Sequence, residues 1–219
     1  MIVVVGGIKG GSGKTTLATN LAAIRAMEGS KILFIDADEQ KSATDWAAQR
    51  ASNEEAGNTV TTIQLSGKGI YTQVSRMKED YDDIIIDVGG RDTTSQRSAL
   101  TIADVLVVPF KPRSLDIWTL GSLKTLIHEI KAVNPELACL AVVNQADSRG
   151  SDNEDAIEIL KECSEIQCLD HAIGYRKAFG NAASDGLSVV EMKDKDKKAV
   201  EEIRKLHDHI YVTCFASRI

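Results

Sequence analysis

The clearest chemistry in this chain lies in eight consecutive residues near its start, Lys9-Gly10-Gly11-Ser12-Gly13-Lys14-Thr15-Thr16. The three glycines lack side chains that would block a group of phosphate oxygens from the backbone N–H groups. Two lysines add positive charge, and the Thr15 hydroxyl suits a magnesium ion. All eight residues are therefore predicted to bind the phosphates of a nucleotide, with Thr15 also a metal ligand.

The flanking residues supply the elements that this loop needs. An apolar run at Ile2–Val5 predicts a strand before it, and Leu17–Ala23 continues a helix after it. A helix that begins near Lys14 points the positive end of its dipole at the phosphates. In such a strand–loop–helix unit, Lys14 is expected to reach the β- and γ-phosphates.

Acidic residues follow two of the expected strands. Asp87 ends the buried run 84–86 and is the expected second metal anchor, although it could also be a loop aspartate that caps the next helix. Asp36 and Asp38 follow the second strand two residues apart, so their side chains face the same way. That arrangement suits one shared site for a metal and a water molecule.

Alternating strands and helices predict an α/β fold with a mostly parallel sheet and helices on both faces. No linker or repeat interrupts the chain, so residues 1–219 are expected to form one domain without a separate N-terminal DNA-reading domain. Strands are expected at 2–5, 31–35, 60–65, 84–87, 105–110, 140–143 and 169–173. Helices are expected at 15–27, 44–51, 71–78, 95–103, 115–133, 154–163 and 199–211.

Composition narrows the classes of protein. With 26% charged and 43% hydrophobic residues, the chain is typical of a soluble globular protein, and its nucleotide chemistry points to the cytoplasm. No apolar run approaches the ~18 residues of a membrane span. The formal net charge of −6 does not indicate a general nucleic-acid binder, so any DNA binding has to come from a local patch.

The loop departs from the common pattern G-x-x-x-x-G-K-[ST], because Ile8 stands where the first glycine should be. It fits K-G-G-x-x-K-T instead, and so resembles the deviant Walker A loop of the ParA/MinD group of ATPases. The resemblance implies ATP and Mg²⁺ as cofactors and an ATP-driven sandwich homodimer in which Lys9 reaches phosphates held by the partner. Lys9 could otherwise be a solvated lysine or add charge only to its own site.

Two further segments resemble this group. Residues 36–42 resemble its D-x-D-P-Q-x-S segment, with Glu39 where proline is common, and Trp46 matches an aromatic residue just beyond it. Residues 103–109 and 112–118 resemble a later block that is close to small plasmid-partition ATPases. The resemblance implies that Asp38 positions the attacking water, that Asp36 lies near the magnesium, and that Lys9, Lys14 and Asp38 are catalytic. Residues 88–92 would form a switch loop that senses the γ-phosphate.

The function that the resemblance favours is DNA partition by a nucleoid-associated ATPase. The ATP dimer would bind DNA without sequence preference, and a ParB-like adaptor on a centromere or cargo would stimulate hydrolysis. Candidate DNA contacts are Arg176, Lys177, Lys198 and Lys205, although a solvated helix face explains the last two equally well. Asn144, at the end of a strand, is the expected contact for the base.

Three alternatives stay open. A MinD-like ATPase would bind membranes through a basic amphipathic tail, but residues 210–219 carry only Arg218 as a basic residue, so no membrane partner is expected. A ligase-type synthetase of the same group would need a second substrate site, for which no residues stand out. A relative that positions organelles or other cargo on the nucleoid would use the same chemistry as plasmid partition.

Overall fold

The computed structural model describes residues 1–219 except 58–59, 91–92, 113–116, 150 and 214–219. Seven strands form its sheet: β1 (Ile2–Val5), β2 (Ile32–Ala37), β3 (Thr61–Gln64), β4 (Asp83–Val88), β5 (Val105–Phe110), β6 (Ala138–Ala146) and β7 (Gln167–Gly174). Its α-helices are α1 (Lys14–Met27), α2 (Ser42–Ala51), α3 (Gly69–Met77), α4 (Thr94–Leu100), α5 (Ile117–Lys131), α6 (Asp152–Lys161), α7 (Lys177–Ser184) and α8 (Lys197–Asp208). A short 3-10 turn, Lys78–Asp80, follows α3, and a π-helical turn, His209–Thr213, extends α8.

The strands pair in the order β3-β2-β4-β1-β5-β6-β7, and every described pair is parallel. Because the strands are parallel, the loops that follow β1, β2 and β4 all emerge at one edge of the sheet. The register places Asp36 opposite Asp87 on neighbouring strands. The fold therefore gathers the glycine loop and both acidic segments at that edge.

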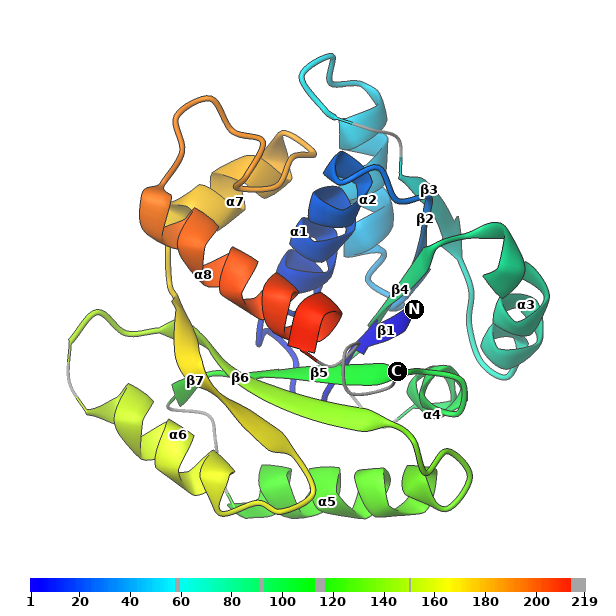
Figure 1. The fold of residues 1–219 in the computed structure, drawn as a ribbon, viewed down its shortest axis with the longest axis vertical. Coiled ribbons are helices and arrows are strands. Elements are labelled where there is room, and N and C mark those ends of the chain that lie inside the picture. The colour runs from blue at the N-terminus through cyan, green and yellow to red at the C-terminus, as the bar shows by residue number, and fades with distance from the viewer. Residues whose placement is uncertain (58–59, 91–92, 113–116, 150, 214–219) are drawn as a thin grey trace.

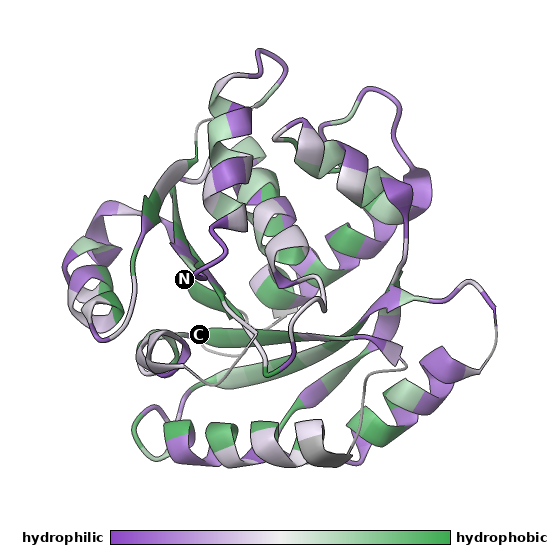
Figure 2. Ribbon diagram, turned by 180° about the vertical axis from the view of Figure 1, so that it is seen from behind, coloured by the Kyte–Doolittle hydropathy of each residue, from purple (hydrophilic) through white to green (hydrophobic). Residues whose placement is uncertain are grey.

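Each face of the sheet buries its own core. The face covered by α1, α2, α7 and α8 packs around Leu17, Phe34 and Ile203. The other face, covered by α3, α4, α5 and α6, packs around Ile86, Leu100 and Leu126. Figure 1 shows the two helical layers on either side of the sheet. In Figure 2 the strands are mostly green and hydrophobic, and purple residues gather on the outer helices and loops, as expected when helices cover both faces. The predicted α/β architecture is confirmed.

The predicted elements agree with the structure except at the late part of the chain. The strand expected at 140–143 extends to Ala138–Ala146, and the helix expected at 95–103 ends at Leu100. Helix α7 has no counterpart in the prediction, because Gly180 and Asn181 interrupt its pattern with residues that disfavour helices. The described residues do not include 113–116, which belong to the later block of the resemblance at 112–118, or the tail 214–219.

A buried ion pair ties α2 to the segment that follows α7. Arg50 and Glu191 are 5% and 4% exposed, and Arg50 Nη2 lies 2.8 Å from Glu191 Oε1. Glu191 also accepts hydrogen bonds from the backbone N–H groups of Ser188 and Gly57. Burial opposes the charge of Glu191, but the Arg50 hydrogen bond and the backbone donors outweigh it, so the pKa of Glu191 is lowered.

Glu191→Gln is expected to destabilise the fold by about 3 kcal/mol, because it leaves the Arg50 charge buried without a counter-charge. The melting temperature should fall by about 6–12 °C in a chain of this size. Since a depressed pKa contributes stability only while the carboxyl is ionised, the wild type should also lose stability as pH falls through the pKa of Glu191. Thermal melts would measure both effects. Glu55→Gln, which removes the exposed partner of Lys193, should change the melting temperature by under about 2 °C.

Candidate functional site

The glycine loop runs from the end of β1 to the start of α1 and forms one wall of a large cavity. Gly13 caps α1 with φ 89°, a left-handed conformation that favours glycine, and the helix begins at Lys14 as the loop pattern requires. The cavity has a volume of about 1190 Å³ and is lined by Gly10, Gly11, Gly13, Lys14, Thr15 and Thr16 from this segment. Such a volume accommodates a nucleotide.

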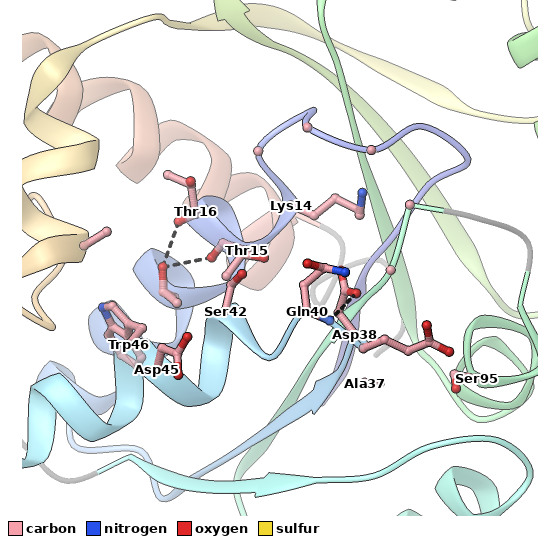
Figure 3. Close-up of a pocket in the computed structure, with 18 of the residues that line it drawn as sticks. Lys14, Thr15, Thr16, Ala37, Asp38, Gln40, Ser42, Asp45, Trp46 and Ser95 are labelled. Carbon is pink, nitrogen blue, oxygen red and sulfur yellow. Dashed lines mark hydrogen bonds between the residues drawn. The ribbon is translucent and has the colours of Figure 1, made fainter.

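The opposite wall of the cavity comes from the loop after β2 and from α2. It includes Asp38, Gln40 and Ser42, followed by Asp45 and Trp46. Figure 3 shows these side chains facing the cavity across from Lys14, Thr15 and Thr16. Asp38 Oδ1 accepts a hydrogen bond from the Gln40 backbone N–H at 3.1 Å, which shapes the turn around Asp38. The structure therefore brings Asp38 and the glycine loop to the same cavity.

Lys14 is a buried cation within the glycine loop. Its side chain is 6% exposed, and Nζ donates a hydrogen bond to the Lys9 carbonyl oxygen at 2.9 Å. Burial lowers the pKa of Lys14, while the charges of Asp87 and Asp38 act in the opposite direction. An anion in the cavity would supply the counter-charge that a desolvated ammonium lacks.

Thr15 and Asp87 form the part of the site that suits a metal ion. The Thr15 hydroxyl donates to Asp87 Oδ2 at 2.6 Å, whereas Asp87 Oδ1 is buried and has no hydrogen-bond partner. Burial, with help from the charges of Asp36 and Asp38, raises the pKa of Asp87 to about 7, although the Thr15 hydrogen bond and Lys14 lower it. A hydroxyl oxygen beside an unpartnered carboxylate oxygen is a donor set that fits Mg²⁺.

Asp36 lies beside Asp87, but its carboxylate accepts hydrogen bonds from the start of α2. Oδ2 accepts hydrogen bonds from the backbone N–H and the hydroxyl of Thr44, at 2.8 and 2.6 Å, and Oδ1 accepts one from the Asp38 N–H. Asp36 is 2% exposed and is not among the residues that line the cavity. Its contacts show a structural role at the start of α2, and its predicted metal role stays a prediction.

The loop after β4 packs directly against the glycine loop. A side chain on Gly90 would place its Cβ 2.5 Å from the Gly10 backbone nitrogen, so only glycine fits this approach. A Cβ on Gly89 would lie 3.4 Å from Asp38 Oδ1. Residues 89–90 therefore touch both walls of the site, as a segment that senses the γ-phosphate would need to do. Residues 91–92 of the predicted switch loop lie outside the described part of the chain.

Lys9 and Asn144 are placed differently from the other predicted residues. Lys9 is half-buried and lines a small separate cavity with Val108, Phe110 and Lys111 instead of the nucleotide-sized one. Asn144 is buried, and its Nδ2 donates to the Ser12 carbonyl oxygen at 2.7 Å. The structure thus shows Asn144 in contact with the loop, and its contact with a base stays a prediction.

The four predicted DNA contacts lie on α7 and α8 or directly before α7. Lys177 and Lys198 are exposed, and Lys205, two turns beyond Lys198, pairs with Glu201 at 2.7 Å on the surface. Arg176 is half-buried and donates from Nε to Glu202 at 2.9 Å. Its guanidinium joins α7 to α8 and would have to leave Glu202 to bind phosphate, and its DNA contact stays a prediction.

Sequence reasoning missed several cavity residues, and three of them have polar side chains near the site. Gln49 and Ser184 line the cavity from α2 and α7, and Gln145 Nε2 donates to the Gly11 carbonyl oxygen at 3.1 Å. Ser184 could not be found because α7 itself was not predicted. Gln145 carried one signal, its position at the carboxyl end of a parallel strand, where sites of this fold class gather.

The chain is similar to a nucleotide-binding family over most of its length. Residues 3–189 match the family described as "CobQ/CobB/MinD/ParA nucleotide binding domain". The relative named "Maintenance of carboxysome distribution protein A" from Halothiobacillus neapolitanus is 24% identical over 94% of both chains. The protein of the same name from Gloeobacter kilaueensis is 30% identical over 88% of this chain and 85% of its own length.

Solved structures agree on the fold. A protein described as a plasmid partition protein of Borrelia burgdorferi B31, bound to AMPPNP, superposes with a TM-score of 0.71. The match covers 100% of this chain and 99% of that one, at 19% sequence identity. At this identity the likeness shows the fold alone. Within the described residues, no helix is both long and apolar enough to span a membrane.

Proposed function

Because the chain belongs to the CobQ/CobB/MinD/ParA family of nucleotide-binding domains, we propose that it is a ParA-type ATPase that partitions DNA or positions another cargo. The observation that carries this proposal is that Lys14, Thr15 and Asp38 line one cavity, and that the Thr15 hydroxyl donates to the buried Asp87 carboxylate behind it. Those groups suffice for phosphoryl transfer to water, which needs mainly positioning and charge stabilisation.

Each group has a distinct part in ATP hydrolysis. Lys14 and the N–H groups of the glycine loop hold the phosphates, and the buried Lys14 ammonium offsets their charge. Thr15 and Asp87 would hold Mg²⁺, which supplies further charge neutralisation when bound. Asp38 faces the cavity next to residues 89–90 and would orient the attacking water. This assignment keeps ATP and Mg²⁺ as the cofactors.

A sandwich homodimer explains the position of Lys9. Its side chain does not line the cavity that holds Lys14, although its carbonyl oxygen accepts the Lys14 hydrogen bond. A lysine that served only its own site would be expected to line that cavity. We assign Lys9 to the phosphates of a second copy of the chain, so ATP would join the two subunits.

The ATP dimer would bind DNA without sequence preference. Lys177, Lys198 and Lys205 supply positive charge at the surface of α7 and α8, on a chain whose net charge is −6. Contacts of this kind go to phosphates, so binding should weaken steeply as salt rises. A ParB-like adaptor on the cargo would stimulate hydrolysis and release the dimer from DNA, in the cytoplasm at the nucleoid.

The identity of the cargo is the more specific part of the proposal. The two relatives described above are named for carboxysome distribution, and they match most of this chain. A cargo-positioning ATPase and a plasmid-partition ATPase differ in the adaptor and not in the nucleotide site. A membrane-bound MinD-like role has less support, because residues 210–219 carry only Arg218 as a basic residue, whereas an amphipathic membrane anchor carries several.

Size-exclusion chromatography tests the proposal directly. The protein should elute as a dimer with ATP or AMPPNP and as a monomer with ADP. DNA binding at low salt should require the triphosphate and should be lost when salt is raised from about 50 to 200 mM. A chain that stays monomeric with every nucleotide and binds no DNA at low salt would contradict the proposed function.

The pKa of Asp87 predicts how Mg²⁺ binding depends on pH. Without metal this carboxyl titrates at about 7, and a metal ligand has to be deprotonated. Lowering the pH from 8 to 6 should therefore weaken Mg²⁺ binding to the AMPPNP complex by about tenfold. Mg²⁺ titrations at the two pH values would measure this. Asp87→Asn has no titrating group there, so any pH dependence that it retains belongs to the nucleotide.

A further inference from the structure

Two neighbouring amide side chains at the end of β6 hold the glycine loop through its carbonyl groups. Asn144 Nδ2 donates to the Ser12 carbonyl oxygen at 2.7 Å, and Gln145 Nε2 donates to the Gly11 carbonyl oxygen at 3.1 Å. The two contacts span 132 and 134 residues of sequence. Consecutive residues of one strand end thus bind consecutive carbonyl groups of the loop.

The backbone at this position is strained. Gln145 has φ 55°, and among the described residues it shares a positive φ outside glycine only with Lys41. The pairing of β6 with β7 shifts register between Asn144 and Ala146, so a bulge surrounds Gln145. Left-handed backbone is costly for a residue with a side chain, and it persists where the surrounding structure requires it. Here the bulge turns the Gln145 amide toward the loop.

The geometry of a trans peptide connects these hydrogen bonds to the phosphate site. In a planar trans peptide, the C=O group and the following N–H group point in opposite directions. When the Gly11 carbonyl oxygen is held toward β6, the Ser12 N–H points away from β6. When the Ser12 carbonyl oxygen is held toward β6, the Gly13 N–H also points away from it. The fit is tight, since a Cβ on Gly13 would lie 2.3 Å from Asn144 Nδ2.

We propose that Asn144 and Gln145 are positioning residues for phosphate binding, which orient the Ser12 and Gly13 N–H groups through the carbonyl groups behind them. Donors that are oriented before the ligand arrives lose less freedom on binding. The proposal rests on the proposed nucleotide-binding function and gives both residues a role that is independent of the base. The role that it gives to Asn144 is a contact with the glycine loop in place of the predicted contact with the base.

Affinities for three ligands test the proposal: ATP, GTP and inorganic tripolyphosphate, each measured by competition with a fluorescent ATP analogue. Asn144→Leu and Gln145→Met keep side chains of similar size and remove the donors. Each variant should bind ATP about fivefold to tenfold more weakly, the effect of losing one hydrogen bond. Tripolyphosphate affinity should fall by the same factor, and the ratio of ATP to GTP affinity should not change. Gln73→Met, on the exposed surface of α3, is the matched control.

Gln145→Gly separates positioning from general stability. Glycine relieves the left-handed strain, so the melting temperature without nucleotide should rise by about 2–4 °C while ATP affinity falls. If both the melting temperature and the ATP affinity fell, the role of Gln145 would be merely structural and the proposal would be overturned. A changed ratio of ATP to GTP affinity in Asn144→Leu would also overturn the proposal, because it would show a base contact. Wild-type affinities in all variants would also overturn it, whereas failure of the wild type to bind ATP would refute the proposed function itself.

Discussion

Lys14→Ala is expected to lose ATP binding, with an affinity at least about 100-fold below that of the wild type. One hydrogen bond to a charged group contributes about 1.5–3 kcal/mol, or roughly 10- to 150-fold in affinity, and Lys14 is assigned to two phosphates. The loss should not come from unfolding. Lys14 is a desolvated cation whose described hydrogen bond goes to a neutral carbonyl oxygen, so its removal should leave the melting temperature without nucleotide unchanged or slightly higher.

Isothermal titration with ATP and AMPPNP would measure the affinity, and a melt without nucleotide would measure stability. Lys14→Met keeps most of the volume of the side chain and should behave like the alanine variant. Lys78→Ala removes a half-exposed lysine at the end of α3 and should bind ATP like the wild type. Retained ATP affinity in Lys14→Met would show that the phosphates lie elsewhere in the cavity.

Lys9→Ala should separate nucleotide binding from dimerisation. The contact that Lys9 makes with Lys14 uses the backbone carbonyl oxygen, which alanine also has, so this hydrogen bond within the glycine loop should remain. ATP affinity of the monomer should therefore stay within about threefold of the wild type. The side chain is assigned to the partner's phosphates, so the ATP-dependent dimer should weaken by about 100-fold, the effect of a lost charged hydrogen bond at each of two symmetric sites.

Analytical ultracentrifugation with AMPPNP would measure the dimer, and adaptor-stimulated hydrolysis should be lost with it. Lys9→Arg is the informative control, because it keeps the charge and the reach and should restore part of the dimer. If Lys9→Ala dimerised with AMPPNP as the wild type does, Lys9 would be a surface residue and the sandwich arrangement would lose its main support.

Local patterns in the sequence predicted the elements that carry the phosphates. Strands β1, β2, β4, β5 and β6 are apolar enough to recognise, and the glycine loop between Ile2–Val5 and the first helix identified the fold class. What could not be predicted are contacts between distant residues. The Arg176–Glu202 pair and the Asn144–Ser12 hydrogen bond depend on how β7, α8 and β6 meet in space, and no spacing along the chain encodes them.

The acidic residues illustrate the same limit. Their positions after parallel strands placed Asp36, Asp38 and Asp87 at one edge of the sheet, and the structure agrees. Their different surroundings follow from packing alone. Both oxygens of Asp36 accept hydrogen bonds, one from Thr44 and the other from the Asp38 N–H, whereas one oxygen of Asp87 has no partner. The sequence shows that three carboxylates lie at one edge of the sheet, but it does not show which role each of them has.

Trp46 gives the chain an optical reporter of its own site. The indole is 4% exposed, lies edge-on to Phe34 at 5.8 Å and donates Nε1–H to the Leu187 carbonyl oxygen, yet it also lines the cavity. A buried indole whose one edge faces the ligand changes its emission when that environment changes. In a Trp118→Phe background it would be the sole tryptophan of the chain. Intrinsic fluorescence could then follow each nucleotide state in real time without an attached dye.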